Sequence, residues 1–326
     1  MNTNEQTYGD QLEPYRRELV AHCYRMLGSL HDAEDAVQET LLRAWRGLGR
    51  FEGRSSLRSW LYTIATNVCL RALERRPTRV LPVDYGPPAD PHVPLGPPLV
   101  EPIWIEPFPD VQLGLGGGLA GPEARYEQRE AVELAFIAAV QHLPARQRAV
   151  LILRDVLGFS GAEVAETLDT TTASVYSLLQ RAHATIDGRL PERSQQATLR
   201  SLGDDQLTAI VDRYVEAWAR SDVDAIVGML TESVMLAMPP TPAWFRGRDA
   251  IATLWGAGPL DGSKSWSLLP TSANGQLAMG AYLLDRAGDY RPYGLTVLTL
   301  RDEQIDEMHT FRDPMAPERF GLPARP

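Results

Sequence analysis

The chain has 326 residues, a formal net charge of −10 and two cysteines. This length predicts two or three domains, and the apolar runs are too short to cross a membrane. Residues 1–10 are polar and lack the apolar core of a secretion signal, so we expect a cytoplasmic protein. Cys23 and Cys69 fall within helical patterns and are expected to be buried reduced thiols. Residues 1–77 sum to only +1, which argues against tight DNA binding by the chain alone.

A compact helical domain is predicted over residues 10–77, with helices over about 11–29, 32–48 and 57–75. The middle helix has the apolar period of one buried face, with Asp32 expected to cap it. Its predicted inward positions are Ala33, Ala36, Val37, Leu41, Ala44, Trp45 and Leu48.

The loop over residues 49–56 carries an aromatic ring together with several hydrogen-bond donors. This combination suits stacking on, and hydrogen bonding to, an unpaired base. Asn67 and Arg71 lie one turn apart on the next helix, where a phosphate backbone could run. The alternative is an ordinary helical bundle with solvated charges.

The detailed strings Asp32–Leu41, Phe51–Leu61 and Ile64–Asn67 resemble the second domain (σ2) of extracytoplasmic-function (ECF) sigma factors of the sigma-70 family. The resemblance implies that the 32–48 helix binds the β′ clamp of the RNA polymerase core. The residues expected in this contact are Asp32, Asp35, Gln38, Glu39 and Arg43. It also implies capture of the melted −10 promoter element by Phe51, Arg54, Ser55, Ser56, Asn67 and Arg71.

Residues 78–122 are rich in proline, which excludes long regular elements and predicts a linker. A disordered spacer is one interpretation. However, Ile103, Trp104, Ile105 and Phe108 are clustered, and a spacer rarely holds so many large apolar groups. We therefore expect this segment to dock in a groove.

Residues 123–190 are predicted to form a second helical domain, with one helix over 144–157, that ends in a helix-turn-helix. The last helix begins at Thr172, with Thr171 as its N-cap, and such a helix would enter the major groove. The strings Leu143–Leu151 and Val175–Ala182 resemble the σ4 domain of the same family, which implies binding to the β flap and −35 recognition. The residues expected to contact DNA are Thr172, Ser174, Tyr176, Ser177, Gln180 and Arg181. Asp169 stands where a glycine is common, which leaves the turn type open.

After a polar hinge over residues 191–201, helices are expected first, with one strand over 234–238. Strands are then expected over 265–273, 276–286, 292–301 and 304–312. Helices followed by such an antiparallel meander predict an α+β domain over 202–326. The order of elements resembles the SnoaL-like, or ketosteroid-isomerase-like, cone. The expected pocket would be lined by Trp218, Met238, Trp244, Tyr282, His309 and Phe311 and could hold a small apolar ligand. His309 and Asp313 could form an acid–base pair, but no carboxylate pair is evident, so a structural histidine is favoured.

The chain is therefore interpreted as a multidomain protein, with all-α σ2 and σ4 domains followed by an α+β SnoaL-like domain. We expect a transcription initiation factor that binds core polymerase and promoter DNA, with the third domain regulating it in cis. No catalytic residue, metal or cofactor is predicted. The alternatives are a ligand-responsive helix-turn-helix regulator and a cyclase or isomerase fused to a sigma module.

Overall fold

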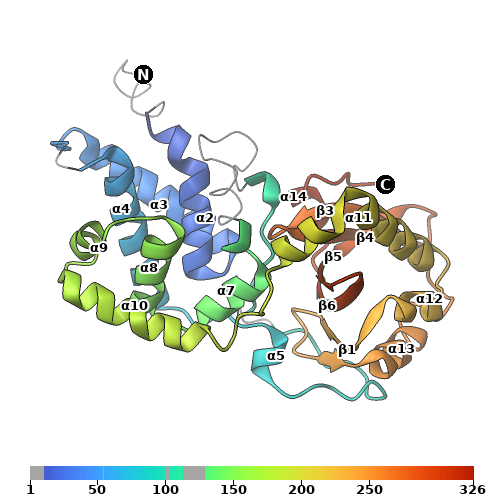
Figure 1. Cartoon of the computed structure of the whole chain (residues 1–326). Helices are drawn as coiled ribbons and strands as arrows, with labels where there is room; N and C mark the ends of the chain where they lie inside the picture. Colours follow the sequence, from blue (N-terminus) through green and yellow to red (C-terminus); the bar gives the residue numbers. More distant parts are fainter. Residues whose placement is uncertain (1–10, 54, 100–102, 113–128) are drawn as a thin grey trace. The chain divides into compact units, whose positions relative to one another are not determined.

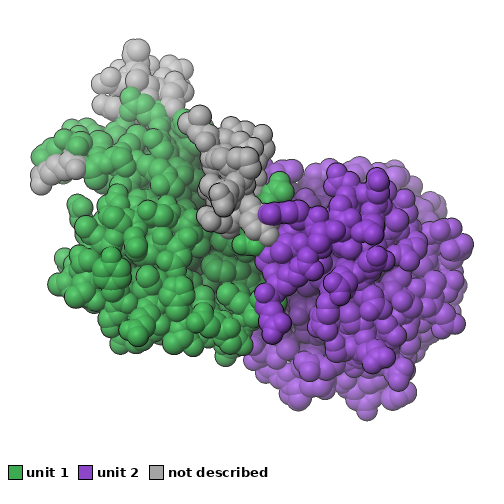
Figure 2. Space-filling model, viewed as in Figure 1, with its two compact units in different colours: residues 1–79, 112–191 green, residues 80–111, 192–326 purple. Residues whose placement is uncertain are grey.

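The structure is a computed structural model, and it describes residues 11–53, 55–99, 103–112 and 129–326. The chain forms two compact units (Figures 1 and 2), of which unit 1 holds residues 1–79 and 112–191. Unit 2 holds residues 80–111 and 192–326. In the described part of the chain, each helix is too short or too polar to cross a membrane.

The σ2-like part of unit 1 consists of η1 (Glu13–Tyr15), α2 (Arg16–Leu27), α3 (Leu30–Leu48) and α4 (Leu57–Leu73). Gly28 ends α2 in the left-handed region, with φ of 69°, and Ser29 then caps α3 by accepting a hydrogen bond from Asp32 N. Ser29, rather than the predicted Asp32, is therefore the cap. Cys23 and Cys69 are buried free thiols, and burial raises the pKa of Cys69, as expected for an inert interior thiol.

The σ4-like part of unit 1 consists of α7 (Leu134–Gln141), α8 (Ala145–Leu151), η3 (Ile152–Val156), α9 (Gly161–Thr167) and α10 (Thr172–Ile186). The predicted 144–157 helix changes from α to π geometry at Ile152, where Leu157 N donates to Ile152 O at 3.0 Å. Ser160 and Glu163 form a capping box that starts α9.

Buried arginines join the two halves of unit 1. Arg148 of α8 is 3% exposed and donates to the carbonyl oxygens of Met26, Gln141 and Leu143. Arg25 of α2 donates to Ala131 O at 3.0 Å in the same region. Since buried charges are tolerated only when hydrogen-bonded, these arginines make the contact specific in geometry.

Unit 2 is built on a mixed six-stranded sheet with the order β2-β1-β6-β5-β4-β3. The strands are β1 (Leu230–Ala237), β2 (Trp244–Arg246), β3 (Trp266–Ala273), β4 (Gln276–Leu284), β5 (Tyr290–Arg301) and β6 (Gln304–Phe311). Strands β3 to β6 form the predicted antiparallel meander, and β1 joins it by pairing parallel to β6. Strands β3 to β6 lie within two residues of their predicted ranges. By contrast, β1 begins four residues before the strand predicted from residue 234, and β2 was not predicted.

One face of the sheet carries the main core of unit 2. Helices α11 (Gln195–Ala219), α12 (Val223–Gly228) and α13 (Arg248–Gly256) follow the curve of the sheet (Figure 1). Leu236, Met279, Leu298 and Met308 belong to the core cluster that packs with these helices. Because side chains alternate along a strand, their strand neighbours face the opposite side.

Unit 2 begins earlier than the predicted boundary at residue 202. Ser194 caps α11, which includes a non-helical residue at Gly203. The buried Gln195 side chain donates to Leu300 O at 2.8 Å and accepts from Leu300 N at 2.6 Å. The predicted polar hinge therefore contains residues that are integral to the sheet.

The opposite face of the sheet is covered by two segments of low regularity. One is the strap, defined as residues 80–111, which contains α5 (Pro82–Tyr85) and leads into η2 (Asp110–Gln112). The other is the C-terminal segment with α14 (Ala316–Arg319), where Tyr282 donates to Pro323 O at 2.6 Å. Gly280 leaves space for Leu322, because an added Cβ would lie 2.2 Å from a Leu322 methyl carbon.

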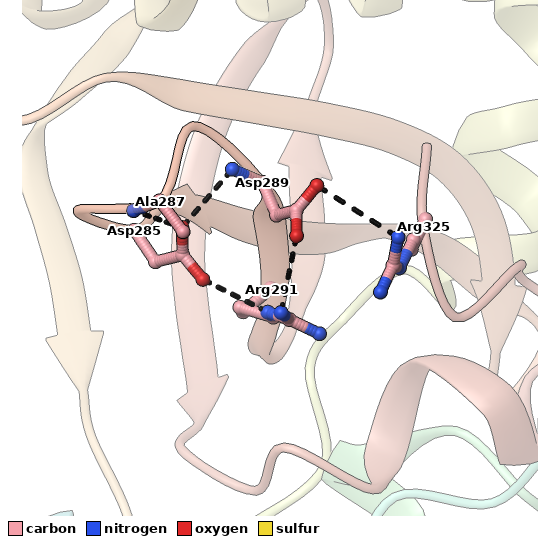
Figure 3. A network of polar contacts seen from close by, with 5 residues as sticks. All are labelled: Asp285, Ala287, Asp289, Arg291 and Arg325. Carbon is pink, nitrogen blue, oxygen red and sulfur yellow. Dashed lines mark hydrogen bonds and ion pairs between the residues drawn. The ribbon is translucent and has the colours of Figure 1, made fainter.

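Charged side chains connect the end of the chain to the β4–β5 turn (Figure 3). Asp285 accepts from Ala287 N and Asp289 N and pairs with Arg291 at 2.9 Å. Asp289 pairs with Arg291 at 3.2 Å and lies 3.8 Å from Arg325. The hydrogen bonds from Arg291 and from the backbone lower the pKa of Asp285, so its carboxylate stays charged at neutral pH.

The strap docks by both backbone hydrogen bonds and buried rings. Trp104, 6% exposed, donates its indole N–H to Pro240 O at 3.0 Å. Phe108 is fully buried, and its backbone exchanges hydrogen bonds with Asn274 at 2.7 and 2.9 Å. Val80 and Trp104 form a parallel bridge, so the strap closes a loop on itself. For the described residues 80–99 and 103–111, the prediction that this segment docks rather than remaining a free spacer is confirmed.

Candidate polymerase and promoter interfaces

The outward face of α3 is a mixed acidic and apolar surface. Asp35 and Gln38 are exposed, and Glu39 pairs with Arg43 at 2.6 Å while its side chain remains 43% exposed. Leu42 and Trp45 lie on the same stripe and are 41% and 43% exposed. The prediction that Trp45 faces inward is wrong.

The buried face of α3 explains why its large apolar groups point outward. Inside are small residues, among them Ala33, Ala36, Thr40 and Ala44, which allow close packing of α3. Leu42 and Trp45 therefore have no place in this core. The sequence contains a pattern that could have predicted this exposure. Small residues repeat at the helical period on the buried face, and a second stripe of larger apolar residues lies beside them.

Asp32 is positioned differently from the other predicted polymerase contacts. Its side chain is 11% exposed and pairs with Arg79 at 2.5 Å, and also with Arg76. This pairing ties the start of α3 to the chain that follows α4. Asp32 therefore has a structural partner within unit 1, whereas Asp35 and Gln38 present their side chains to solvent.

The predicted −10 residues occupy the loop before α4 and one side of that helix. The Phe51 ring packs 5.0 Å from Trp60, and Ser56 caps α4 by accepting from Ser59 N. Ser55 is half-buried, Asn67 donates to Thr63 O at 2.9 Å, and Arg71 is exposed. Arg54 lies outside the described residues.

The predicted −35 residues lie along α10 as expected for a recognition helix. Thr171 caps the helix through Ser174 N, and Val175, Ala182 and Ile186 are buried. Along the outer side, Ser174 is half-buried, and the exposed residues are Thr172, Tyr176, Ser177, Gln180 and Arg181. Arg181 donates to Ser177 O at 3.2 Å, a surface contact that a DNA base could replace.

The turn between α9 and α10 uses Asp169 in the conformation of a glycine. Its φ is 48°, in the left-handed region that Asp and Asn tolerate better than most residues. Arg146 donates to Leu168 O at 2.6 Å and supports the same turn. The departure from glycine therefore leaves the helix-turn-helix geometry intact.

The predicted pocket of unit 2 does not assemble, because its residues lie on opposite faces of the sheet. Trp218 packs on the helix side, 5.5 Å from Trp255 and 5.8 Å from Trp266, and Met238 packs against the same core. Trp244 and His309 lie on the other face, in register through Ala237. The strand alternation places Tyr282 and Phe311 there as well. The prediction of one pocket is therefore wrong, because its lining residues are divided between the two faces of the sheet.

His309 pairs with a carboxylate other than the one predicted. It is 1% exposed, and its Nε2 lies 3.2 Å from Glu307 Oε2 on the same strand. Desolvation acts to raise the pKa of Glu307, but the His309 hydrogen bond and the charges of Arg301 and Arg246 outweigh it and lower that pKa. Asp313 instead accepts from Met315 N in a turn. The structural interpretation of His309 fits this arrangement.

Three family models match the chain: sigma-70 region 2 over residues 12–78, sigma-70 region 4 over 133–186, and a SnoaL-like domain over 211–308. The ECF RNA polymerase sigma factor SigG of Mycobacterium tuberculosis is 46% identical over 322 residues, covering 95% of this chain and 82% of SigG. SigJ of the same species is 27% identical over 325 residues, covering 93% and 91% of the two chains.

The crystal structure of M. tuberculosis SigJ matches with a TM-score of 0.57 at 23% identity, covering 97% of this chain and 99% of that one. The fold and the comparisons together define a sigma-70-type protein with a SnoaL-like extension. The chain belongs to the ECF RNA polymerase sigma factors, which are transcription initiation factors and not enzymes.

Proposed function

We propose that this sigma factor binds the polymerase β′ clamp through the outward face of α3. The observation that supports it most directly is the exposure of Leu42 and Trp45 beside Asp35, Gln38 and Glu39. Apolar groups that stay exposed on an otherwise well-packed helix are typical of an interaction surface, and the charges beside them give specificity. Core polymerase and promoter DNA are cytoplasmic, so we place the protein in the cytoplasm.

Reversal of two acidic charges tests the anchor. Asp35→Lys together with Glu39→Lys should abolish co-purification with core polymerase while the helix content stays unchanged. Trp45→Ala should weaken it through lost apolar burial. Glu216→Lys, at an exposed acidic position on α11, is the control and should bind core normally. Normal binding by the double variant would refute the α3 anchor.

Promoter reading is assigned to two elements of unit 1: the loop before α4 with Asn67 and Arg71 for the −10 element, and α10 for the −35 element. This assignment rests on the exposed outer side of α10 and on the aromatic loop. Arg181→Ala in run-off transcription should cost about 1–3 kcal/mol of promoter discrimination if Arg181 contacts a base edge. An equal loss on every promoter would instead make it a phosphate contact.

Unit 2 is proposed to regulate transcription initiation in cis by binding the strap, which links σ2 to σ4. The support is the docked strap, in which Trp104 and Phe108 are buried against unit 2. Loosening the strap by Trp104→Ala should change run-off output at equal core occupancy, with Val93→Ala, an exposed strap position, as the control. Identical output from Trp104→Ala and wild type would defeat regulation through the strap.

A further inference from the structure

The guanidinium of Arg58 in α4 lies over two aromatic rings, one from each half of unit 1. The guanidinium carbon is 4.8 Å from the centroid of the Tyr62 ring and 5.2 Å from that of Phe159. The two rings meet edge to face at 5.3 Å. Tyr62 belongs to α4, whereas Phe159 comes from the loop before α9, so the cluster spans the σ2–σ4 contact.

Contacts within σ2 hold the guanidinium in place. Glu18 of α2 pairs with Arg58 Nε at 3.0 Å and accepts from the Tyr62 hydroxyl at 3.2 Å. Burial and the nearby Glu18 carboxylate raise the pKa of Tyr62, which keeps that hydroxyl a donor. These partners engage one edge of Arg58, and its side chain remains 39% exposed.

Phe159 is presented to this platform by a fixed loop. Gly158 has φ of 72°, Phe159 N donates to Leu153 O at 2.9 Å, and Arg154 donates to Phe159 O. The Phe159 ring is 7% exposed. Nearby, Thr63 lies 3.0 Å from Thr167, hydroxyl to hydroxyl, which continues the α4–α9 contact along the helix.

We infer that Arg58 is a stacking platform for an unpaired nucleobase of single-stranded DNA, and that Phe159 occupies this platform while σ2 and σ4 remain in contact. A flat aromatic ring on a guanidinium is the arrangement by which proteins hold splayed bases. Arg58 lies two residues after Ser56, in the first turn of α4, and precedes Asn67 on the same helix. The inference therefore deepens, and rests on, the proposed −10 capture by this loop and helix.

A plain structural role for the cluster predicts different behaviour from a base platform. Lysine at position 58 would keep the positive charge and could still pair with Glu18, but it has no plane on which a base can stack. Arg58→Lys therefore separates the two roles. A charge contact would survive this substitution, whereas a stacking contact would not.

The test uses the full-length chain and a fluorescein-labelled pool of random-sequence 12-nucleotide single strands, followed by anisotropy. Phe159→Ala should raise affinity for the pool about 5- to 150-fold, the range for one stacked base. Adding Arg58→Lys or Arg58→Ala to Phe159→Ala should remove this gain. Hydrogen exchange over residues 159–168 reports whether the α4–α9 contact has loosened. If it has not, Thr167→Arg, which places a bulky charge against Thr63, replaces Phe159→Ala in the same scheme.

Each outcome decides a different step. If the α4–α9 contact loosens but the single strands bind no more tightly, the proposal that Phe159 covers the platform is wrong. Tighter binding that survives Arg58→Lys overturns the platform, and its loss only in Arg58→Ala would make Arg58 a charge contact. Phe51→Ala in the opened chain tests the proposed −10 loop separately: if binding persists there and is lost in Arg58→Lys, the platform stands and the loop assignment fails. Core co-purification should be normal for all Arg58 variants, since α3 is untouched.

Discussion

The two internal contacts of the molecule are built from different chemistry. The σ2–σ4 contact in unit 1 adds buried polar groups to the Tyr62–Phe159 ring pair. Chief among them are Arg148 and Arg25, which donate to backbone carbonyl oxygens. The strap contact in unit 2 buries Trp104, Ile105 and Phe108 and adds backbone hydrogen bonds.

This difference predicts which contact yields first. Polar contacts exchange hydrogen bonds with water at modest net cost when they separate, because both sides can be solvated again. Exposing aromatic rings to water carries the full cost of apolar hydration. We therefore expect σ2 and σ4 to part more readily than the strap leaves unit 2, and the following experiments test that order.

The largest effect is expected at Trp104. Trp104→Ala removes a buried indole and its bond to Pro240 O, and should lower the free energy of unfolding of unit 2 by about 3–5 kcal/mol. Chemical denaturation measures this, and hydrogen exchange should show the loss confined to unit 2. Val93→Ala on the same strap should change stability by less than about 0.5 kcal/mol. Equal effects at the two positions would mean that the strap is not held by its buried rings.

Arg148→Met should reduce the stability of unit 1 by about 3 kcal/mol. The side chain volume is nearly kept, but the carbonyl oxygens of Met26, Gln141 and Leu143 lose their donor. Hydrogen exchange of α8 and α2 should increase while unit 2 stays protected. Arg16→Ala, at an exposed ion pair, is the control with little effect. Unchanged stability of Arg148→Met would show that the hydrogen bonds of Arg148 do not hold σ2 and σ4 together.

Acid should weaken unit 1 through His22, which is fully buried. Desolvation, with the charges of Arg25 and Arg58, lowers the pKa of His22 from 6.5 to about 3. Between these values the unfolded chain binds a proton that the folded chain does not. The free energy of unfolding should therefore fall by about 1.4 kcal/mol per pH unit below pH 6.5, down to about pH 3.

Denaturant titrations from pH 7 to pH 4 measure this slope. His22→Gln should flatten it, and His92→Gln, at an exposed strap position, should leave it unchanged. A slope that persists in His22→Gln would assign the acid sensitivity to other groups.

The smallest effects distinguish two residues with left-handed backbones. Asp169 has φ of 48° with an exposed side chain, so Asp169→Gly should stabilise unit 1 by about 0.5 kcal/mol. Asn274 has φ of 56°, but its side chain accepts from Phe108 N, so Asn274→Gly should destabilise unit 2 by about 1–2 kcal/mol. Thermal unfolding of both variants checks the opposite signs.

Local patterns in the sequence were sufficient for the helices, the meander and the docking of the strap. Periodicity placed α10 and strands β3 to β6 within a few residues, and the cluster around Trp104 indicated burial. The outward position of Trp45 was missed, because a helical period alone does not say which of two adjacent apolar stripes is inside. The split of Trp218 from His309 was missed because a pocket depends on strand register across residues far apart in sequence.

The pairing of Arg58 with Phe159 was also beyond the sequence, since about 100 residues separate them and neither stands in a pattern that marks contact. The same holds for Gln195, whose role as a partner of Leu300 made a polar segment part of the sheet. In each case the missing information is long-range contact, which composition and spacing do not encode.

The parallel bridge between Val80 and Trp104 shortens the effective length of the linker between σ2 and σ4. With the strap docked, the chain returns to its starting point after 24 residues, so this stretch contributes almost nothing to the span. An extended chain covers about 3.3 Å per residue, so opening the bridge releases about 80 Å of contour length. A shorter tether raises the effective concentration of one tethered module near the other. A docked strap therefore raises the effective concentration of σ4 near σ2, independently of the contacts that the two domains make.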